Sequence, residues 1–326
     1  MFLKWISKAA RVSCAALVGI LVSAGAQAAA KEQLKMAVVP AAGVLPVYVA
    51  DKKGYFQDEG LEFEMLPINS GPGAATAVVS GSADMGYGGA LPIIAARAQG
   101  IPFKIVLGGY ADQQGVYADT VMLASKKSGI ERIEDLNGKT IAINNAGGIS
   151  DLQVRIKLHR AGISADEVKI LAVPFPQMPA ALELGNADVV STVAPFSTTI
   201  LMKDLGKVIA EGYVQEEDLA KPVPVAGFYA TESWVAKHPG TLAKVRRAID
   251  RANQLIKEDP AEAKKILKAQ MRLQDDLLEA IDIPPYDTRI DANGVQAIMD
   301  AAHLVKILAK PMTADEVLID DAVAAN

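Results

Sequence analysis

The chain has 326 residues, 51% of them hydrophobic, and a formal net charge of −5. A chain of this length and composition is expected to bury its cores in two domains. Its acidic balance and the absence of a Lys/Arg-rich stripe argue against nucleic acid as a partner.

The first 28 residues have the three parts of a secretory signal peptide. Lys4, Lys8 and Arg11 form a basic front, residues 12–25 are apolar, and residues 26–28 read Ala-Gln-Ala. Removal of this segment takes the net charge from −5 to −8, because three basic residues leave with it. The mature chain is therefore expected in the bacterial periplasm, as a soluble protein.

The signal also contains Cys14, the only cysteine of the chain. The residues before it do not resemble a lipoprotein cleavage site, so no lipid anchor is expected. The mature chain is then expected to have no disulfide, no thiolate metal site and no cysteine nucleophile.

Strands and helices are predicted to alternate after the signal. Strands are expected at 34–40, 61–68, 83–89 and 102–110, with helices at 45–60, 71–81 and 91–100 between them. This order is typical of an open, mostly parallel sheet flanked by helices. A second set repeats the design, with strands at 120–125, 139–145, 167–175, 187–195 and 207–212 and helices at 130–138, 149–162, 178–186 and 197–206.

One short motif occurs in both sets. A helix, a Gly, a small-Ala-Asp triplet and a strand occur around Ala83-Asp84 and again around Ala187-Asp188. The repetition indicates two α/β lobes of similar design, with equivalent places for the two Ala-Asp pairs.

The last hundred residues are mainly helical. Leu242, Val245, Ile249, Ala252 and Ile256 recur at helical spacing, and Asp259 precedes Pro260 as an N-cap with Glu262 three residues later. These helices are expected to pack on the first lobe. The chain then has to cross between the lobes twice, near residues 110–120 and 221–229, and two such segments form a hinge. The predicted organisation is a signal peptide at 1–28, lobe I at 29–115 and 224–326, and lobe II at 116–223.

Motifs for catalysis are weak or absent. The Gly-Lys-Thr at 138–140 lacks the earlier glycine of a phosphate loop and precedes a strand, and Leu91 interrupts the glycine pattern of a dinucleotide site. His159, His238 and His303 are scattered over charged helical segments, where solvated surface is the better interpretation. No catalytic residue, cofactor or metal is predicted.

Six loops are instead expected to converge at the carboxyl ends of the strands, where open α/β sheets bind ligands. They are rich in Gly, Ser and Asn, and none contains Lys, Arg, His or a carboxylate; they span residues 40–43, 69–71, 87–90, 144–148, 174–177 and 194–196.

Such loops lead into helix N-termini, whose unpaired N–H groups hold small anions without a charged side chain. Tyr87, Phe175 and Phe196 are available to cover an apolar tail or ring. Asp151 is expected to compete with an anion for the N–H groups of its helix, and Tyr48 and Tyr110 are left open between the cleft and the core.

Four segments of the chain resemble one transport family. "ADKKGYFQDEGLEFE", "NSGPGAATAVVSGSADMGYGGALPIIAARAQGIPFKIV", "IEDLNGKTIAI" and "FPQMPAALELGNADVV" are similar to periplasmic solute-binding proteins of the nitrate/sulfonate/taurine class of ABC importers. The superfamily also contains binders of thiamine pyrimidine precursors, and the resemblance covers essentially the whole mature chain.

The resemblance implies a two-lobed type II periplasmic binding protein with two hinge strands, which closes over a ligand and delivers it to an ABC permease and its ATPase. The helix N-termini favour a small organic anion as ligand, either sulfonate-, taurine- or nitrate-like or an aromatic carboxylate, and the protein is expected to be a monomer and not an enzyme. The implied contacts, with Tyr87 added from the loops themselves, are Gly43, Ser70, Gly71, Gly89, Ala90, Asn145, Gly147, Gly148, Phe175, Gln177 and Phe196.

Alternatives remain for the ligand and the role. A first loop without a polar side chain and a Pro-rich loop at 174–179 favour a larger, partly aromatic ligand, such as a thiamine-type pyrimidine. A ligand-sensing subunit for a receptor is the runner-up role. A pyrimidine synthase, as in eukaryotic members of the superfamily, uses a cysteine-rich motif that this chain lacks.

Overall fold

The computed structural model describes residues 31–214 and 217–322, and residues 31–326 form one compact unit. The predicted signal peptide, with Cys14, lies outside the described residues. Within the described ranges, no helix combines the length and apolar character that a membrane crossing requires.

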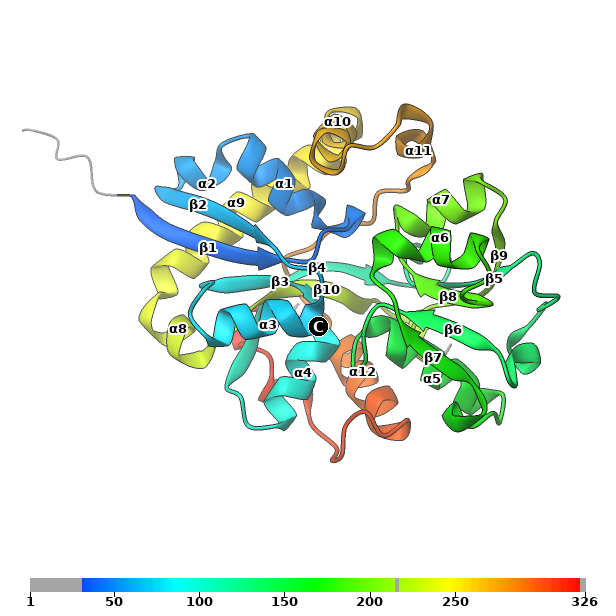
Figure 1. The fold of residues 1–326 in the computed structure, drawn as a ribbon. Helices are drawn as coiled ribbons and strands as arrows, with labels where there is room; N and C mark the ends of the chain where they lie inside the picture. Colours follow the sequence, from blue (N-terminus) through cyan, green and yellow to red (C-terminus); the bar gives the residue numbers. More distant parts are fainter. Residues whose placement is uncertain (1–30, 215–216, 323–326) are drawn as a thin grey trace, which may run out of the picture. The chain divides into compact units, whose positions relative to one another are not determined.

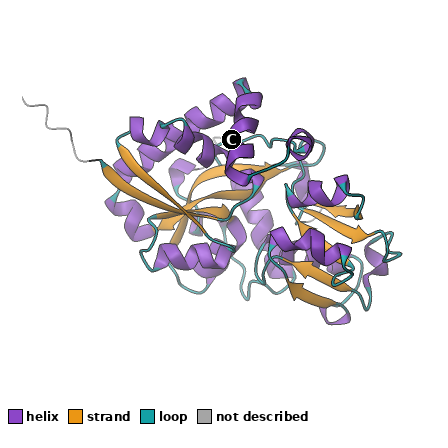
Figure 2. Ribbon diagram, turned by 45° about the horizontal axis from the view of Figure 1, so that its top comes forward, coloured by secondary structure: helices purple, strands orange, loops and turns teal. Residues whose placement is uncertain are grey.

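Two five-stranded sheets organise this unit (Figures 1 and 2). The first has the order β2-β1-β3-β10-β4, and in it β10 alone runs against the other four strands. Its strands are β1 (Glu32–Val38), β2 (Leu61–Pro67), β3 (Met85–Gly89), β4 (Phe103–Asp112) and β10 (Val223–Thr231).

The second sheet repeats this arrangement. Its order is β7-β6-β8-β5-β9, and β5 is the strand that runs against the rest. Its strands are β5 (Val121–Ser125), β6 (Thr140–Ile143), β7 (Lys169–Ala172), β8 (Val189–Thr192) and β9 (Gly206–Glu211). Two mostly parallel sheets of the same topology confirm the predicted α/β fold class.

The repeated Ala-Asp motif makes the same hydrogen bonds in each sheet. Asp84 Oδ2 accepts from the backbone N–H of Lys35 at 2.8 Å, and Asp188 Oδ2 accepts from that of Thr140, also at 2.8 Å. The backbone N–H of each aspartate returns a bond to the carbonyl of the same partner. Gly81 and Gly185 precede the motifs at φ 75° and 74°, where a side chain would be strained. The two Ala-Asp pairs therefore hold equivalent places, as predicted.

Helices cover both faces of each sheet. Beside the first sheet lie α1 (Leu45–Lys52), α2 (Tyr55–Asp58), α3 (Gly71–Val79), α4 (Ala90–Ala98), α8 (Glu232–Lys237), α9 (Pro239–Glu258), α10 (Pro260–Met271), α11 (Asp275–Ala280) and α12 (Ala292–Leu304). Around the second lie α5 (Ile149–Arg160), α6 (Met178–Glu183) and α7 (Phe196–Met202).

The C-terminal helices pack on the first sheet's helices as predicted, with α9 and α10 against α1. The periodic apolar residues of α9 are buried, and the Asp259 carboxylate caps α10 by accepting from Glu262 N at 3.0 Å.

Two segments join the sheets, one between β4 and β5 and one between β9 and β10. The second ends in β10, which lies where a crossing strand was expected, although its pairing inside the first sheet was not predicted. β10 is a strand because it fills the gap between β3 and β4, where its antiparallel pairing satisfies its backbone on both edges. The lobe boundaries given above stay a prediction.

Candidate functional site

A small cavity lies where the loops of the two sheets meet. Its volume is about 60 Å³. It is lined from the first sheet by Val39, Ala41, Gly43, Val44, Tyr87, Gly88, Gly89, Tyr110, Val225 and Ala226, and from the second by Ile149, Phe175 and Val193. The carboxyl ends of β1, β3 and β8 all point to it, as the general rule for open sheets predicts.

The structure brings four of the predicted contacts to this cavity, namely Gly43, Tyr87, Gly89 and Phe175. Phe196 stacks on Phe175, with ring centroids 6.2 Å apart and planes 13° from parallel. The other predicted contacts do not line the cavity: Ser70, Gly71, Ala90, Asn145, Gly147, Gly148 and Gln177. The contact set as a whole stays a prediction.

Gly43 is held against two tyrosines. Its carbonyl accepts a 2.7 Å hydrogen bond from the Tyr87 hydroxyl, and a Cβ at this position would lie 2.2 Å from the Tyr110 ring. Any larger residue would push Tyr110 out of place, so only glycine lets the first loop reach the cavity. Burial raises the pKa of both tyrosines, which remain neutral hydroxyls at physiological pH.

Tyr110 and Tyr48, left open by the sequence, take different places. Tyr110 lines the cavity and is also buried, whereas Tyr48 is buried without lining it. Burial raises the pKa of Tyr48 to about 12.

The N-terminus of α5 already holds a carboxylate of its own. Asp151 Oδ2 accepts from Gly147 N at 2.9 Å, and Asp151 Oδ1 accepts from Arg155 Nε at 2.7 Å. The expected competition between Asp151 and a bound anion is thus built into the structure. This helix end is a poorer anion site than the sequence suggested, because the negative charge that its dipole favours is present.

Ser70 and Asn145 are likewise engaged in local bonds. Ser70 caps α3 by accepting from Gly73 N at 3.3 Å. Asn145 donates to the Ala146 carbonyl at 3.0 Å and accepts from Asn144 Nδ2 at the same distance. A ligand would have to replace these bonds to use either side chain.

Sequence reasoning missed the apolar residues next to the loops. Val44 and Ile149 directly follow predicted loops, Val193 directly precedes one, and Val225 and Ala226 belong to β10. For Val44 and Ile149 an apolar residue directly after such a loop was the available signal, but alone it does not distinguish a cavity wall from core.

The lining of the cavity is neutral. Among the described residues that form it, none is Lys, Arg, His, Asp or Glu. Within the described ranges, no three His, Cys, Asp or Glu side chains are grouped so that they could hold a metal ion. The arrangement offers apolar contact, ring stacking and backbone groups, and it has no side chain poised to transfer a proton at neutral pH.

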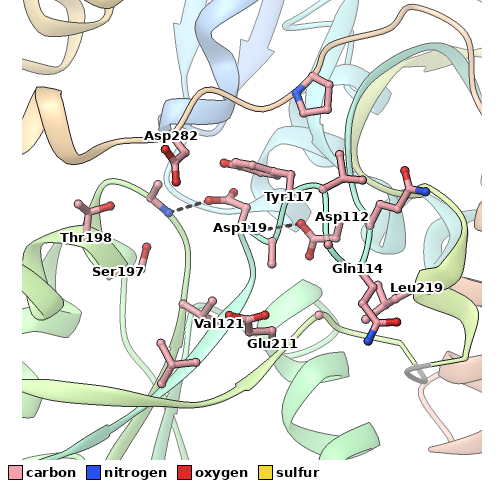
Figure 3. Close-up of a pocket in the computed structure, with 18 of the residues that line it drawn as sticks. Asp112, Gln114, Tyr117, Asp119, Val121, Ser197, Thr198, Glu211, Leu219 and Asp282 are labelled. Carbon is pink, nitrogen blue, oxygen red and sulfur yellow. Dashed lines mark hydrogen bonds between the residues drawn. The ribbon is translucent and has the colours of Figure 1, made fainter.

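A larger cavity of about 820 Å³ lies beside the first crossing segment (Figure 3). Its lining includes Asp112, Asp119, Glu211 and Asp282 and none of the predicted contacts. We place the site at the smaller cavity in spite of its size, because there the strand ends and aromatic rings converge from both sheets.

A model of the family described as NMT1/THI5 like matches residues 41–263, which is more than half of the chain. The chain belongs to the NMT1/THI5-like family. The matched segment includes every residue that lines the small cavity except Val39.

Two curated relatives of this NMT1/THI5-like chain have different names. A protein of Bacillus subtilis named as an aliphatic sulfonates-binding protein is 26% identical over 223 residues. A 4-amino-5-hydroxymethyl-2-methylpyrimidine phosphate synthase of Aspergillus parasiticus is 25% identical over 227 residues. Each match covers 67% of this chain and 64% of the relative, slightly less than two thirds of its length.

A solved structure supports the fold. The alkanesulfonate-binding protein SsuA from Xanthomonas axonopodis pv. citri has a TM-score of 0.75 at 20% identity, covering 88% of this chain and 98% of that chain. The predicted periplasmic binding protein fold is confirmed by this likeness.

Proposed function

We propose that this NMT1/THI5-like protein is the periplasmic solute-binding component of an ABC importer. It captures a small organic molecule between its two sheets and presents it to a membrane permease with its ATPase. The single observation that carries the proposal is the neutral cavity lined from both sheets by small, apolar and aromatic residues. A ligand there favours closure because only the closed arrangement lets both sheets touch it.

The fold and the relatives support this role. The structural neighbour named above is an alkanesulfonate-binding protein, and one curated relative is named for sulfonate binding. The other relative is named as a synthase, yet this cavity presents no cysteine, histidine or carboxylate for chemistry. Binding without turnover is the function that the residues support best.

The ligand is an organic molecule with an aromatic or other apolar body, carrying at most one anionic group. Tyr87, Tyr110 and Phe175 supply the apolar contact, and no basic side chain is present to neutralise a compact anion. The N-terminus of α5 would otherwise bind an anion without an apolar body, but there the backbone N–H of Gly147 is bonded to Asp151. An aromatic carboxylate or sulfonate and a thiamine-type pyrimidine therefore precede nitrate and taurine as candidates.

A thermal-shift panel tests this order. It contains benzoate, benzenesulfonate, benzamide, a hydroxymethylpyrimidine, taurine and nitrate, and calorimetry follows for every hit. A ligand at a hundredfold its Kd adds about 2.7 kcal/mol of stability, which raises Tm by several degrees. We expect aromatic members to bind, with little change in Kd between low salt and about 0.5 M, because no side-chain ion pair is formed. Stabilisation by nitrate or taurine alone would contradict the assignment.

Mass spectrometry of the recovered ligand separates binding from catalysis. We expect every bound molecule to be recovered with its mass unchanged after prolonged incubation. A new mass that depends on the protein would favour the synthase-like alternative.

A further inference from the structure

The carboxylate of Asp119 connects separate segments of the chain. Asp119 lies in the first crossing segment, is 4% exposed, and accepts from the Tyr110 hydroxyl at 2.7 Å. It also accepts from the backbone N–H of Ala194 at 2.9 Å, as Figure 3 shows. One side chain thus joins the end of β4, the crossing segment and the loop that follows β8.

The hydrogen bonds continue across to the first sheet. The carbonyl of Ala194, whose N–H is bonded to Asp119, accepts from the backbone N–H of Ala42 at 3.2 Å. Ala42 begins the turn that contains Gly43 and Val44, and Val193 precedes Ala194; Gly43, Val44 and Val193 all line the small cavity. The path Tyr110–Asp119–Ala194–Ala42 therefore ends at the two loops that face each other across the site.

Asp119 is also well placed to stay ionised. It accepts from the Tyr110 hydroxyl and the Ala194 N–H, whereas the neighbouring Asp112 accepts from Asp119 N at 2.9 Å through Oδ1 and leaves Oδ2 without a hydrogen bond. Burial raises the pKa of both carboxyls. Two donors to Asp119 against one to Asp112 favour placing a proton on Asp112.

We propose that Asp119 is a positioning residue that holds the loop after β8 against the loop after β1. It thereby sets the fraction of molecules in which the two loops lie together at the site. Only one part of this inference rests on the proposed function, namely the expectation that a ligand binds when both loops are in place. The arrangement of the loops themselves can be measured without any ligand.

The test is a distance measurement between spin labels on the full-length chain. Cys14→Ser removes the only cysteine, and cysteines are introduced in place of Val79 after β2 and Leu184 after β7, side chains that are 48% and 74% exposed. Electron–electron double resonance then gives the distance distribution across the two sheets. We expect Asp119→Ala to move at least a third of the molecules from the wild-type distance to a longer one.

Two further variants separate positioning from general damage. Asp119→Asn keeps an acceptor for Ala194 N and polar contact with the Tyr110 hydroxyl, and we expect it to restore most of the wild-type distribution. Tyr110→Phe removes one hydroxyl and keeps the ring, and we expect a shift in the direction of Asp119→Ala. Should Asp119→Ala fail to fold, Tyr110→Phe and Asp119→Asn decide the question.

Ser191→Ala is the matched control. It also deletes a buried hydroxyl, which donates to Gln153 Oε1 at 2.6 Å, and it leaves in place the Gln153 Nε2 bonds to the carbonyls of Thr120 and Gly212 in the crossing segments. We expect its distance distribution to equal that of the wild type. Unchanged distances in both Asp119→Ala and Tyr110→Phe would overturn the proposal, as would an equal shift in Ser191→Ala. If no compound of the ligand panel binds, the proposed function fails, but the spin-label distances still test the role of Asp119.

Discussion

At the scale of single residues, Phe175 is the predicted contact that contributes a phenyl ring to the cavity. It lies at the start of a short turn, is 7% exposed, faces the cavity and stacks on Phe196. A ring in this place supplies apolar area and a stacking surface to any ligand with an aromatic body.

We expect Phe175→Ala to weaken binding of an aromatic ligand by more than tenfold, because the ring's contact with the ligand is lost. Isothermal titration calorimetry with the strongest hit of the panel measures the change. Phe63→Ala is the control, because Phe63 is also stacked, on Phe56 with centroids 4.1 Å apart, but lines no part of the cavity. Equal affinities of the Phe175 variant and the wild type would remove this residue from the site.

Asp112 gives the protein a pH dependence of stability. Burial raises its pKa to about 8 from the ordinary 3.8. The folded state therefore keeps a proton that the unfolded state has lost, and the stability contributed by Asp112 falls as pH rises from about 4 to about 8.

We expect Asp112→Asn to lack this loss, since a neutral amide replaces the protonated acid. At pH 8 the variant should be more stable than the wild type by roughly 1 kcal/mol or more, because one pKa unit corresponds to about 1.4 kcal/mol. At pH 5 the difference should be smaller. Urea unfolding at both pH values measures it, and a pH-independent difference between the two proteins would show that Asp112 is ionised throughout.

At the scale of elements, the two Ala-Asp motifs have the same task in different sheets. Each carboxylate accepts from a backbone N–H of a parallel strand inside the sheet, Lys35 of β1 in one sheet and Thr140 of β6 in the other. Deleting it leaves a backbone donor without its partner.

We expect Asp84→Ala and Asp188→Ala each to lower the free energy of unfolding by about 1–2 kcal/mol. Because the two motifs lie in different sheets and share no partner, the double variant should show the sum of the two losses to within about 0.5 kcal/mol. Chemical denaturation of the three variants measures this. A double variant no weaker than the single ones would mean that the two sheets unfold independently.

Most elements could be predicted from the sequence, because their apolar periods and capping residues act locally. The cap at Asp259 and the apolar stripe of α9 are examples. β10 was expected only as a crossing strand, since its place between β3 and β4 is decided by pairing with segments more than a hundred residues away.

The site was predictable in part for the same reason. Glycines such as Gly43 and Gly89 mark loops in any sequence, and aromatic Phe175 and Tyr87 stand out beside them. Which loop residues face the cavity depends on how the first turn of each helix is oriented about the helix axis. At α5, for example, Ile149 lines the cavity and Asn145 does not. No local pattern in the sequence encodes that rotation.

At the scale of the whole molecule, the two sheets also meet outside the crossing segments. The helix α5 packs against α12 and α7 against α11, a backbone hydrogen bond joins Ala42 to Ala194, and Leu152 and Ile156 of α5 belong to the large buried cluster of the first sheet. A ligand-driven closure as proposed above requires these contacts to have two arrangements.

The register of β4 and β10 has a further consequence for how the chain divides. Asp112 pairs with Val223, so the strands on either side of the intervening 113–222 are already antiparallel neighbours. Excising that insert and bridging the gap with an Asn-Gly reverse turn would leave an ordinary β-hairpin at the heart of the first sheet. We expect this shortened chain to unfold cooperatively when followed by circular dichroism. Its Tm should be lower than that of the full chain, because α12 loses its contacts with α5. A chain without a melting transition would show that the first sheet cannot fold without its insert.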